Sequence, residues 1–163
     1  MNTPENKAGM DGGPVRRQEW RVPARMDGLT GLLAKVEAFL EAAGWSLAAS
    51  HPVLLAIEEL ATNTIKYGYP AAAGTLEVVL AVTAATADLT LRDDGMPFDP
   101  VTAPPPDLDQ PVEDRPIGGL GLHLVRRQSA SFVYRRLATG HNEVHLIFHS
   151  LAATLKSGFQ ELH

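Results

Sequence analysis

The chain of 163 residues contains no cysteine. A protein without thiols forms no disulfide, holds no metal through thiolates and uses no cysteine nucleophile. The sequence also has no run approaching the roughly 18 apolar residues of a membrane span, and its N-terminal residues carry no apolar core of the signal-peptide type. We therefore expect a cytoplasmic protein that does not associate with a membrane.

The sequence also has fewer basic than acidic residues. Lys and Arg number 14 against 19 Asp and Glu, which gives a formal net charge of -5 at pH 7. Because binding to a phosphate backbone depends on positive charge, direct contact with nucleic acid is not expected. The length suits a single folded domain, which we expect over residues 18–150, between a disordered leader at 1–17 and a C-terminal tail at 151–163.

Hydrophobic periodicity predicts the elements of this domain. They are a strand over 18–24, a helix over 26–43, a helix from about residue 50 to residue 67, strands over 75–82 and 87–92, a helix opening at the glycines of 118–121, and strands over 131–137 and 143–148. Pro52 is tolerated best in the first turn of a helix, which favours Ser50 over Ser46 as the start of the second helix. The order of elements predicts an α+β fold, a two-layer sandwich in which helices cover one face of a mixed, mostly antiparallel sheet.

The second helix carries an informative polar pattern. Glu59, Asn63 and Tyr67 are spaced four residues apart, so they form a column beside the apolar side of the helix. A carboxamide oxygen can ligate Mg²⁺ and a neighbouring carboxylate can accept a proton, so this column suits chemistry on metal-bound phosphates. A solvated polar stripe is the alternative interpretation.

Two glycine-containing segments lie further along the chain. The segment DDGMPFDP, at residues 93–100, places Asp93 and Gly95 at the end of a predicted strand. The segment GGLGL, at residues 118–122, opens a helix, and backbone N–H groups at such a junction can bind an anion. Between them, residues 100–116 are rich in proline and acidic residues and form a long loop of the kind that covers a site. Alone, the first segment is usually a turn and the second is usually local backbone geometry.

Together these segments resemble the GHKL superfamily of ATP-binding proteins, and within it the anti-sigma factor serine kinases of bacterial partner switching. The N-box of that family resembles the stretch from Glu59 to Asn63, its G1 box resembles residues 93–99, and its G2 box resembles residues 119–122. The Pro-Phe-Asp continuation and the turn at residues 140–144 favour this subgroup over a sensor kinase. The resemblance covers about residues 20 to 149 and implies the Bergerat ATP-binding fold.

The resemblance also implies ATP and Mg²⁺ as cofactors and gives roles to individual residues. Asn63 would hold Mg²⁺ and Glu59 would be the general base, with Glu58 as second choice because its side chain points about 100° away around the helix. Asp93 would accept a hydrogen bond from the adenine amine, and Gly95 would let the chain approach the base closely. The other implied nucleotide contacts are positive charge from Lys66 or Arg115, backbone N–H groups of Gly119 and Gly121, and the neighbouring residues Tyr67, Pro97, Phe98, Gly118, Leu120 and Leu122.

The implied activity is that of a Mg-ATP-dependent serine/threonine protein kinase. Its substrate would be an anti-sigma factor antagonist, it would also bind a sigma factor or a related regulator, and homodimerisation belongs to the same expectation. Because the loop at 100–116 is rich in proline and has Arg115 as its only basic residue, a second hypothesis stays open: a nucleotide-responsive binding module that sequesters a regulatory partner without phosphotransfer. A purely structural interaction domain with a decayed pocket is the third.

Overall fold

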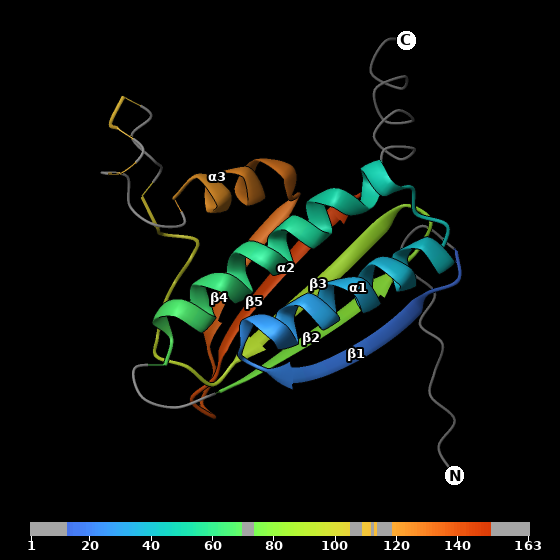
Figure 1. Cartoon of the computed structure of the whole chain (residues 1–163). Coiled ribbons are helices and arrows are strands. Elements are labelled where there is room, and N and C mark those ends of the chain that lie inside the picture. Colours follow the sequence, from blue (N-terminus) through green and yellow to red (C-terminus); the bar gives the residue numbers. More distant parts are fainter. Residues whose placement is uncertain (1–12, 70–73, 105–108, 112, 114–118, 151–163) are drawn as a thin grey trace.

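In the computed structural model, helices lie on one face of a five-stranded sheet (Figure 1). The structure describes residues 13–69, 74–104, 109–111, 113 and 119–150. The elements in chain order are β1 (Arg16–Pro23), α1 (Met26–Ala42), α2 (Leu47–Tyr67), β2 (Thr75–Val82), β3 (Thr86–Asp93), α3 (Gly119–Gln128), β4 (Ser131–Arg136) and β5 (Asn142–His149). No helix within the described ranges is both long and apolar enough to cross a membrane.

The sheet has the strand order β1-β2-β3-β5-β4, and every pairing is antiparallel. The predicted α+β sandwich is confirmed, and the sheet is antiparallel throughout instead of mixed. Since β5 inserts between β3 and β4, the end of β3 lies beside the start of β5, and Asp93 pairs with Asn142. This long-range pairing builds one end of the candidate site.

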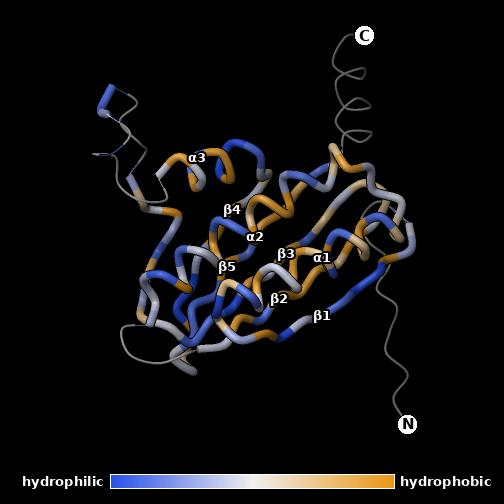
Figure 2. The backbone as a smooth tube through the Cα atoms, in the orientation of Figure 1, coloured by the Kyte–Doolittle hydropathy of each residue, from blue (hydrophilic) through white to orange (hydrophobic). Residues whose placement is uncertain are grey.

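Apolar side chains between the helices and the sheet form the core, and Figure 2 shows hydrophobic stretches on the helices and on the strands beneath them. Burial of one large apolar side chain stabilises a fold by about 1.5–3 kcal/mol, so the core holds α2 firmly over β3 and β5. Trp45 adds a polar tie, because its Nε1 donates to the carbonyl oxygen of Thr83 at 2.9 Å. The core includes Leu32, Val36 and Leu40 of α1, Val53, Ala56, Ile57 and Leu60 of α2, Leu122 and Val125 of α3, and Leu76, Val78, Leu80, Leu89, Leu91, Leu146 and Phe148 of the sheet.

The start of α2 differs from the predicted one. The helix begins at Leu47, and the Ser46 side chain caps it by accepting a hydrogen bond from the backbone N–H of Ala49 at 3.2 Å. A start near Ser50 was therefore wrong: Ala49 and Ser50 are already buried within the helix. Pro52 lies in the second turn, where it removes one backbone hydrogen bond from an otherwise well-packed helix.

Strand boundaries differ less. β1 begins at Arg16, inside the region expected to be a leader, while β3 and β5 each extend one residue beyond both predicted ends. Residues 1–12 of the expected leader and the expected tail at 151–163 lie outside the described residues.

The face of the sheet away from the helices carries a row of alternating charges. Arg21, Glu77, Arg92, Glu143 and Arg135 are successive cross-strand partners from β1 to β4. Arg92 is the centre of this row, since it donates to Glu77 and to Glu143, each at 2.7 Å. Hydrogen bonds from Arg21 and Arg92 lower the pKa of Glu77. Burial acts to raise the pKa of Glu143, but hydrogen bonds from Arg135 and Arg92 outweigh it and lower that pKa.

Candidate functional site

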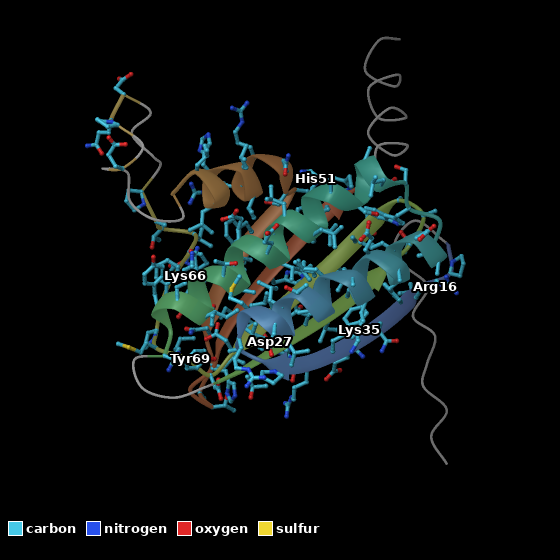
Figure 3. All side chains as sticks on the ribbon, in the orientation of Figure 1. Arg16, Asp27, Lys35, His51, Lys66 and Tyr69 are labelled. Atoms are coloured by element: carbon cyan, nitrogen blue, oxygen red, sulfur yellow. The ribbon has the colours of Figure 1, made fainter. Side chains whose placement is uncertain are left out.

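A cavity of about 210 Å³ opens between the C-terminal half of α2, the end of β3 and the start of β5. Lys66 and Tyr69, labelled in Figure 3, mark this end of α2. The lining is largely apolar, and it consists of Leu60, Asn63, Thr64, Tyr67, Gly68, Leu91, Asp93, Met96, Pro97, Phe98, Pro100, Asn142 and Val144. Five residues expected from the sequence to contact a nucleotide, namely Asn63, Tyr67, Asp93, Pro97 and Phe98, thus lie around one cavity.

Asp93 supplies the only carboxylate among the described lining residues. Its side chain is buried, and Oδ1 accepts hydrogen bonds from the backbone N–H of Gly95 and from Asn142 Nδ2, both at 2.9 Å. Oδ2 accepts only a longer bond, 3.3 Å, from the hydroxyl of Thr64. Because a carboxylate oxygen accepts two hydrogen bonds, Oδ2 can still receive an N–H donor from a molecule in the cavity.

Gly95 lies close to the end of α2. A Cβ atom at this position would be 3.0 Å from the carbonyl oxygen of Gly68 and 3.0 Å from Asp93 Oδ1. The next residue, Met96, donates its backbone N–H to the same Gly68 carbonyl at 2.9 Å. A side chain at this position would therefore press on the end of α2 and on Asp93, so glycine suits the close packing of the segment after β3 beside the cavity.

Asn63 occupies the helix side of the cavity. It is only 8% exposed, and its carboxamide forms no hydrogen bond with any residue that the structure describes. Among the described residues, no fully buried side-chain N or O atom lacks a partner, so the unpaired carboxamide atoms of Asn63 are accessible from the cavity that the residue lines. The carboxamide is therefore available to a molecule in the cavity, and its oxygen is of the kind that binds Mg²⁺.

Glu59 lies one turn before Asn63 and contacts α3 instead of lining the cavity. A Cβ atom on Gly121 would be 1.9 Å from Glu59 Oε2, so the carboxylate packs directly on the first turn of α3 where that residue has no side chain. Burial, followed by repulsion from Glu58, raises the pKa of Glu59, and Lys66 partly opposes the shift. A raised pKa brings a carboxylate closer to the range of a general base at neutral pH.

The residues of α3 divide between two environments. Gly119 is half-buried and Leu120 is exposed, whereas Leu122 belongs to the core with 3% of its surface exposed. None of them is among the cavity lining residues. Arg126, in the last turn, donates to the carbonyl oxygen of Val101 at 2.7 Å, so α3 is tied to the chain that leaves the cavity.

Of the two basic residues expected to contact the phosphates, only Lys66 lies within the described residues. Lys66 is exposed near the C-terminal end of α2 (Figure 3). Arg115 and Gly118 lie outside the described residues, so their expected contacts stay predictions.

Thr64 and Asn142 are site residues that were absent from the sequence-based expectations. Both line the cavity and both donate to Asp93. Thr64 could have been suspected, because it lies next to Asn63 on the same helix. Asn142 belongs to the turn at residues 140–144 that favoured the subgroup, but it had no expected role in the site, because only the pairing of β3 with β5 brings it to Asp93.

The family model of the histidine kinase-like ATPase domain matches residues 22–148. Among curated proteins, the chain is 24% identical over 111 residues to serine-protein kinase RsbW of Bacillus mycoides (strain KBAB4), Bacillus cereus (strain AH187) and Bacillus thuringiensis (strain Al Hakam). Each match covers 66% of this chain and 69% of the relative.

Proposed function

Because the chain belongs to the histidine kinase-like ATPase family, we propose that it binds Mg²⁺-ATP in the cavity beside α2 and transfers the γ-phosphoryl group to a serine or threonine of a protein. The observation that carries this proposal is the pairing of a buried acceptor, Asp93, with an unengaged carboxamide, Asn63, around one apolar cavity. The relatives bear the name serine-protein kinase. An anti-sigma factor antagonist is the proposed substrate, with a sigma factor or related regulator as second partner, in the cytoplasm and in a homodimer.

The base of the nucleotide fits the Asp93 end. Adenine is flat and apolar apart from its edge, so Leu91, Met96 and Val144 suit its faces. The exocyclic amine is a donor, and Asp93 Oδ2 is the acceptor with remaining capacity. Guanine carries a carbonyl oxygen at the same ring position, which would meet a carboxylate oxygen without a proton between them. Adenine is therefore preferred.

The phosphate end is assigned to the α2 and α3 side. Among the described residues, no three His, Asp or Glu side chains are placed to hold a metal ion. This suits Mg²⁺, which is commonly held by few protein groups together with nucleotide phosphates. Asn63 would provide the protein oxygen, and the ion would neutralise phosphate charge. Gly119 and Gly121 would donate backbone N–H groups, and Lys66 would add positive charge.

Glu59 is the proposed general base. It would accept the proton of the substrate hydroxyl while the hydroxyl oxygen forms a bond to the γ-phosphorus and the bond between that phosphorus and the ADP oxygen breaks. The raised pKa of Glu59, caused first by burial and then by Glu58, makes it a better proton acceptor than an ordinary surface carboxylate. Its contact with Gly121 supports this role, because it brings the carboxylate to the helix terminus that we propose binds phosphate.

The test separates nucleotide binding from transfer. The phosphoacceptor is first isolated by a pull-down from the protein's own cells with and without ATP, followed by mass spectrometry. Glu59→Gln is then expected to bind ATP normally and to abolish transfer of radiolabelled phosphate, whereas Asn63→Ala weakens ATP binding itself. Glu37→Gln, on the exposed face of α1, is the matched control and keeps both activities.

Two results would contradict parts of the proposal. Equal transfer by the wild type and Glu59→Gln removes Glu59 from its role as base. ATP binding without transfer to any captured partner favours the nucleotide-responsive binding module that sequesters its partner. The contact between Glu59 and Gly121 is the observation that supports this binding-module alternative, since the carboxylate is engaged against α3.

A further inference from the structure

The Asn142 carboxamide is a junction between the candidate site and the outer hairpin of the sheet. Its Nδ2 donates to Asp93 Oδ1 at 2.9 Å and to the carbonyl oxygen of Met96 at 2.8 Å. Its Oδ1 accepts from the hydroxyl of Tyr134 at 2.8 Å and from Arg136 Nη1 at 3.0 Å. The residue is 4% exposed, and the hydrogen-bonding capacity of the carboxamide is filled.

The partners determine which way the carboxamide points. Arg136 is a permanent donor, so the atom facing it must be the oxygen. A flipped carboxamide would direct its NH₂ group at the Arg136 guanidinium and its oxygen at two further oxygens, those of Asp93 and Met96. The β4 side chains therefore fix the amide nitrogen on Asp93.

Arg136 also holds the segment after β3 directly. The same Nη1 atom that donates to Asn142 donates to the carbonyl oxygen of Gly95 at 2.9 Å. The carboxylate of Asp93, the backbone of Gly95 and Met96, and the hairpin of β4 and β5 thus form one hydrogen-bonded unit. Movement of the Asp93 carboxylate would break its contacts with Asn142 of β5 and with the backbone of Gly95.

We propose that Asn142 is a positioning residue for base selection, which acts through Asp93 and is itself oriented by Tyr134 and Arg136. This inference rests on the proposed binding of ATP. Asn142 and the Gly95 N–H occupy Asp93 Oδ1 and leave Oδ2, which accepts only the 3.3 Å bond from Thr64, for the amine of adenine. Without the amide, the carboxylate can turn, and a single well-aimed acceptor is lost. A nucleotide that lacks the amine gains nothing from this alignment.

The experiment measures the affinity of the full chain for three nucleotides by titration calorimetry in the presence of Mg²⁺. They are ATP, GTP and purine riboside triphosphate, which has hydrogen where adenine has its amine. Asn142→Ala is expected to weaken ATP binding about tenfold and to leave binding of the purine riboside nucleotide unchanged. The preference of the Asn142→Ala variant for ATP over GTP falls by the same factor as its affinity for ATP. His141→Ala, which changes the neighbouring residue outside the cavity lining, is the matched control.

A second background tests whether Asn142 acts through Asp93. In Asp93→Asn, the further change Asn142→Ala is expected to cause no additional loss of ATP affinity. If Asn142→Ala does not fold, Tyr134→Phe provides the test, because it removes one donor that orients the carboxamide. The expected effect is about a threefold loss for ATP, again with none for the purine riboside nucleotide.

The outcomes distinguish the inference from the function on which it rests. No binding of ATP by the wild type overturns both. Binding of ATP by the wild type, with equal losses for all three nucleotides in the variants, overturns the positioning role and keeps the proposed function. Equal losses of this kind are what a merely structural role predicts.

Discussion

Arg92 offers a sharp test of the charged row on the open face of the sheet. Arg92→Met keeps most of the apolar stem but removes hydrogen bonds of 2.7 Å to Glu77 and to Glu143. Charge-assisted bonds of this kind contribute about 1.5–3 kcal/mol each when well shielded. Arg92 is 36% exposed and each carboxylate keeps a second arginine, so we expect a total loss of about 2 kcal/mol. The melting temperature should fall by about 4–8 °C.

The pH dependence identifies the cause of this loss. The pKa values of Glu77 and Glu143 are lowered from 4.5 in the fold. A carboxylate with a lowered pKa stabilises the protein above its unfolded pKa, and the stabilisation disappears as pH falls through the folded pKa. The difference in unfolding free energy between wild type and Arg92→Met should therefore be largest near neutral pH and shrink below about pH 4.5.

Urea denaturation at a series of pH values measures the loss of unfolding free energy in Arg92→Met and the dependence of that loss on pH. Arg17→Met is the matched control, because the Arg17–Glu19 pair is 60% and 50% exposed and exposed pairs contribute less than about 1 kcal/mol. A loss for Arg92→Met that is the same at every pH, or no larger than that for Arg17→Met, would refute the reasoning.

Two further predictions concern the proposed base. In Gly121→Ala the new Cβ would lie 1.9 Å from Glu59 Oε2, so the carboxylate is displaced. We expect the rate of phosphate transfer to fall about 100-fold while the affinity for ATP changes little. An unaltered transfer rate would contradict the assignment of Glu59 as the base. Gly31→Ala, also helical but with no atom within 4 Å of the new Cβ, is its control. The raised pKa of Glu59 means that its stabilising contribution is present below pH 4.5 and is lost as pH rises through the folded pKa. At about pH 7.5, Glu59→Gln should thus have a melting temperature equal to or above that of the wild type, and at acid pH it should have no such advantage. A lower melting temperature of Glu59→Gln at neutral pH would contradict this prediction.

Local patterns predicted much of the fold. The helix at α1 and both hairpins follow from periodicity and turn residues, because each depends on neighbours close in sequence. The start of α2 was misjudged because the proline rule favoured Ser50, whereas Ser46 caps the helix and the buried Ala49 and Ser50 extend it. Tertiary packing outweighed a local preference.

The candidate site was predictable where chemistry alone picks out a residue. Asn63 and Asp93 are unusual polar residues beside apolar patterns, and both line the cavity. Asn142 could not be found in this way, since its role depends on the register of two strands that are distant in sequence. The contact of Glu59 with Gly121 likewise depends on how α3 packs against α2, which no local pattern specifies.

The central claim is that one cavity binds the base at Asp93 and the metal-bound phosphates at Asn63. Titration calorimetry of ATP into the wild type, Asp93→Asn and Asn63→Ala, with and without Mg²⁺, tests it most directly. The wild type should bind ATP more tightly with Mg²⁺. Asp93→Asn should lose affinity in both conditions, and Asn63→Ala should lose chiefly the gain from Mg²⁺. Absence of binding by the wild type, or variants that bind as the wild type does in both conditions, would contradict the claim.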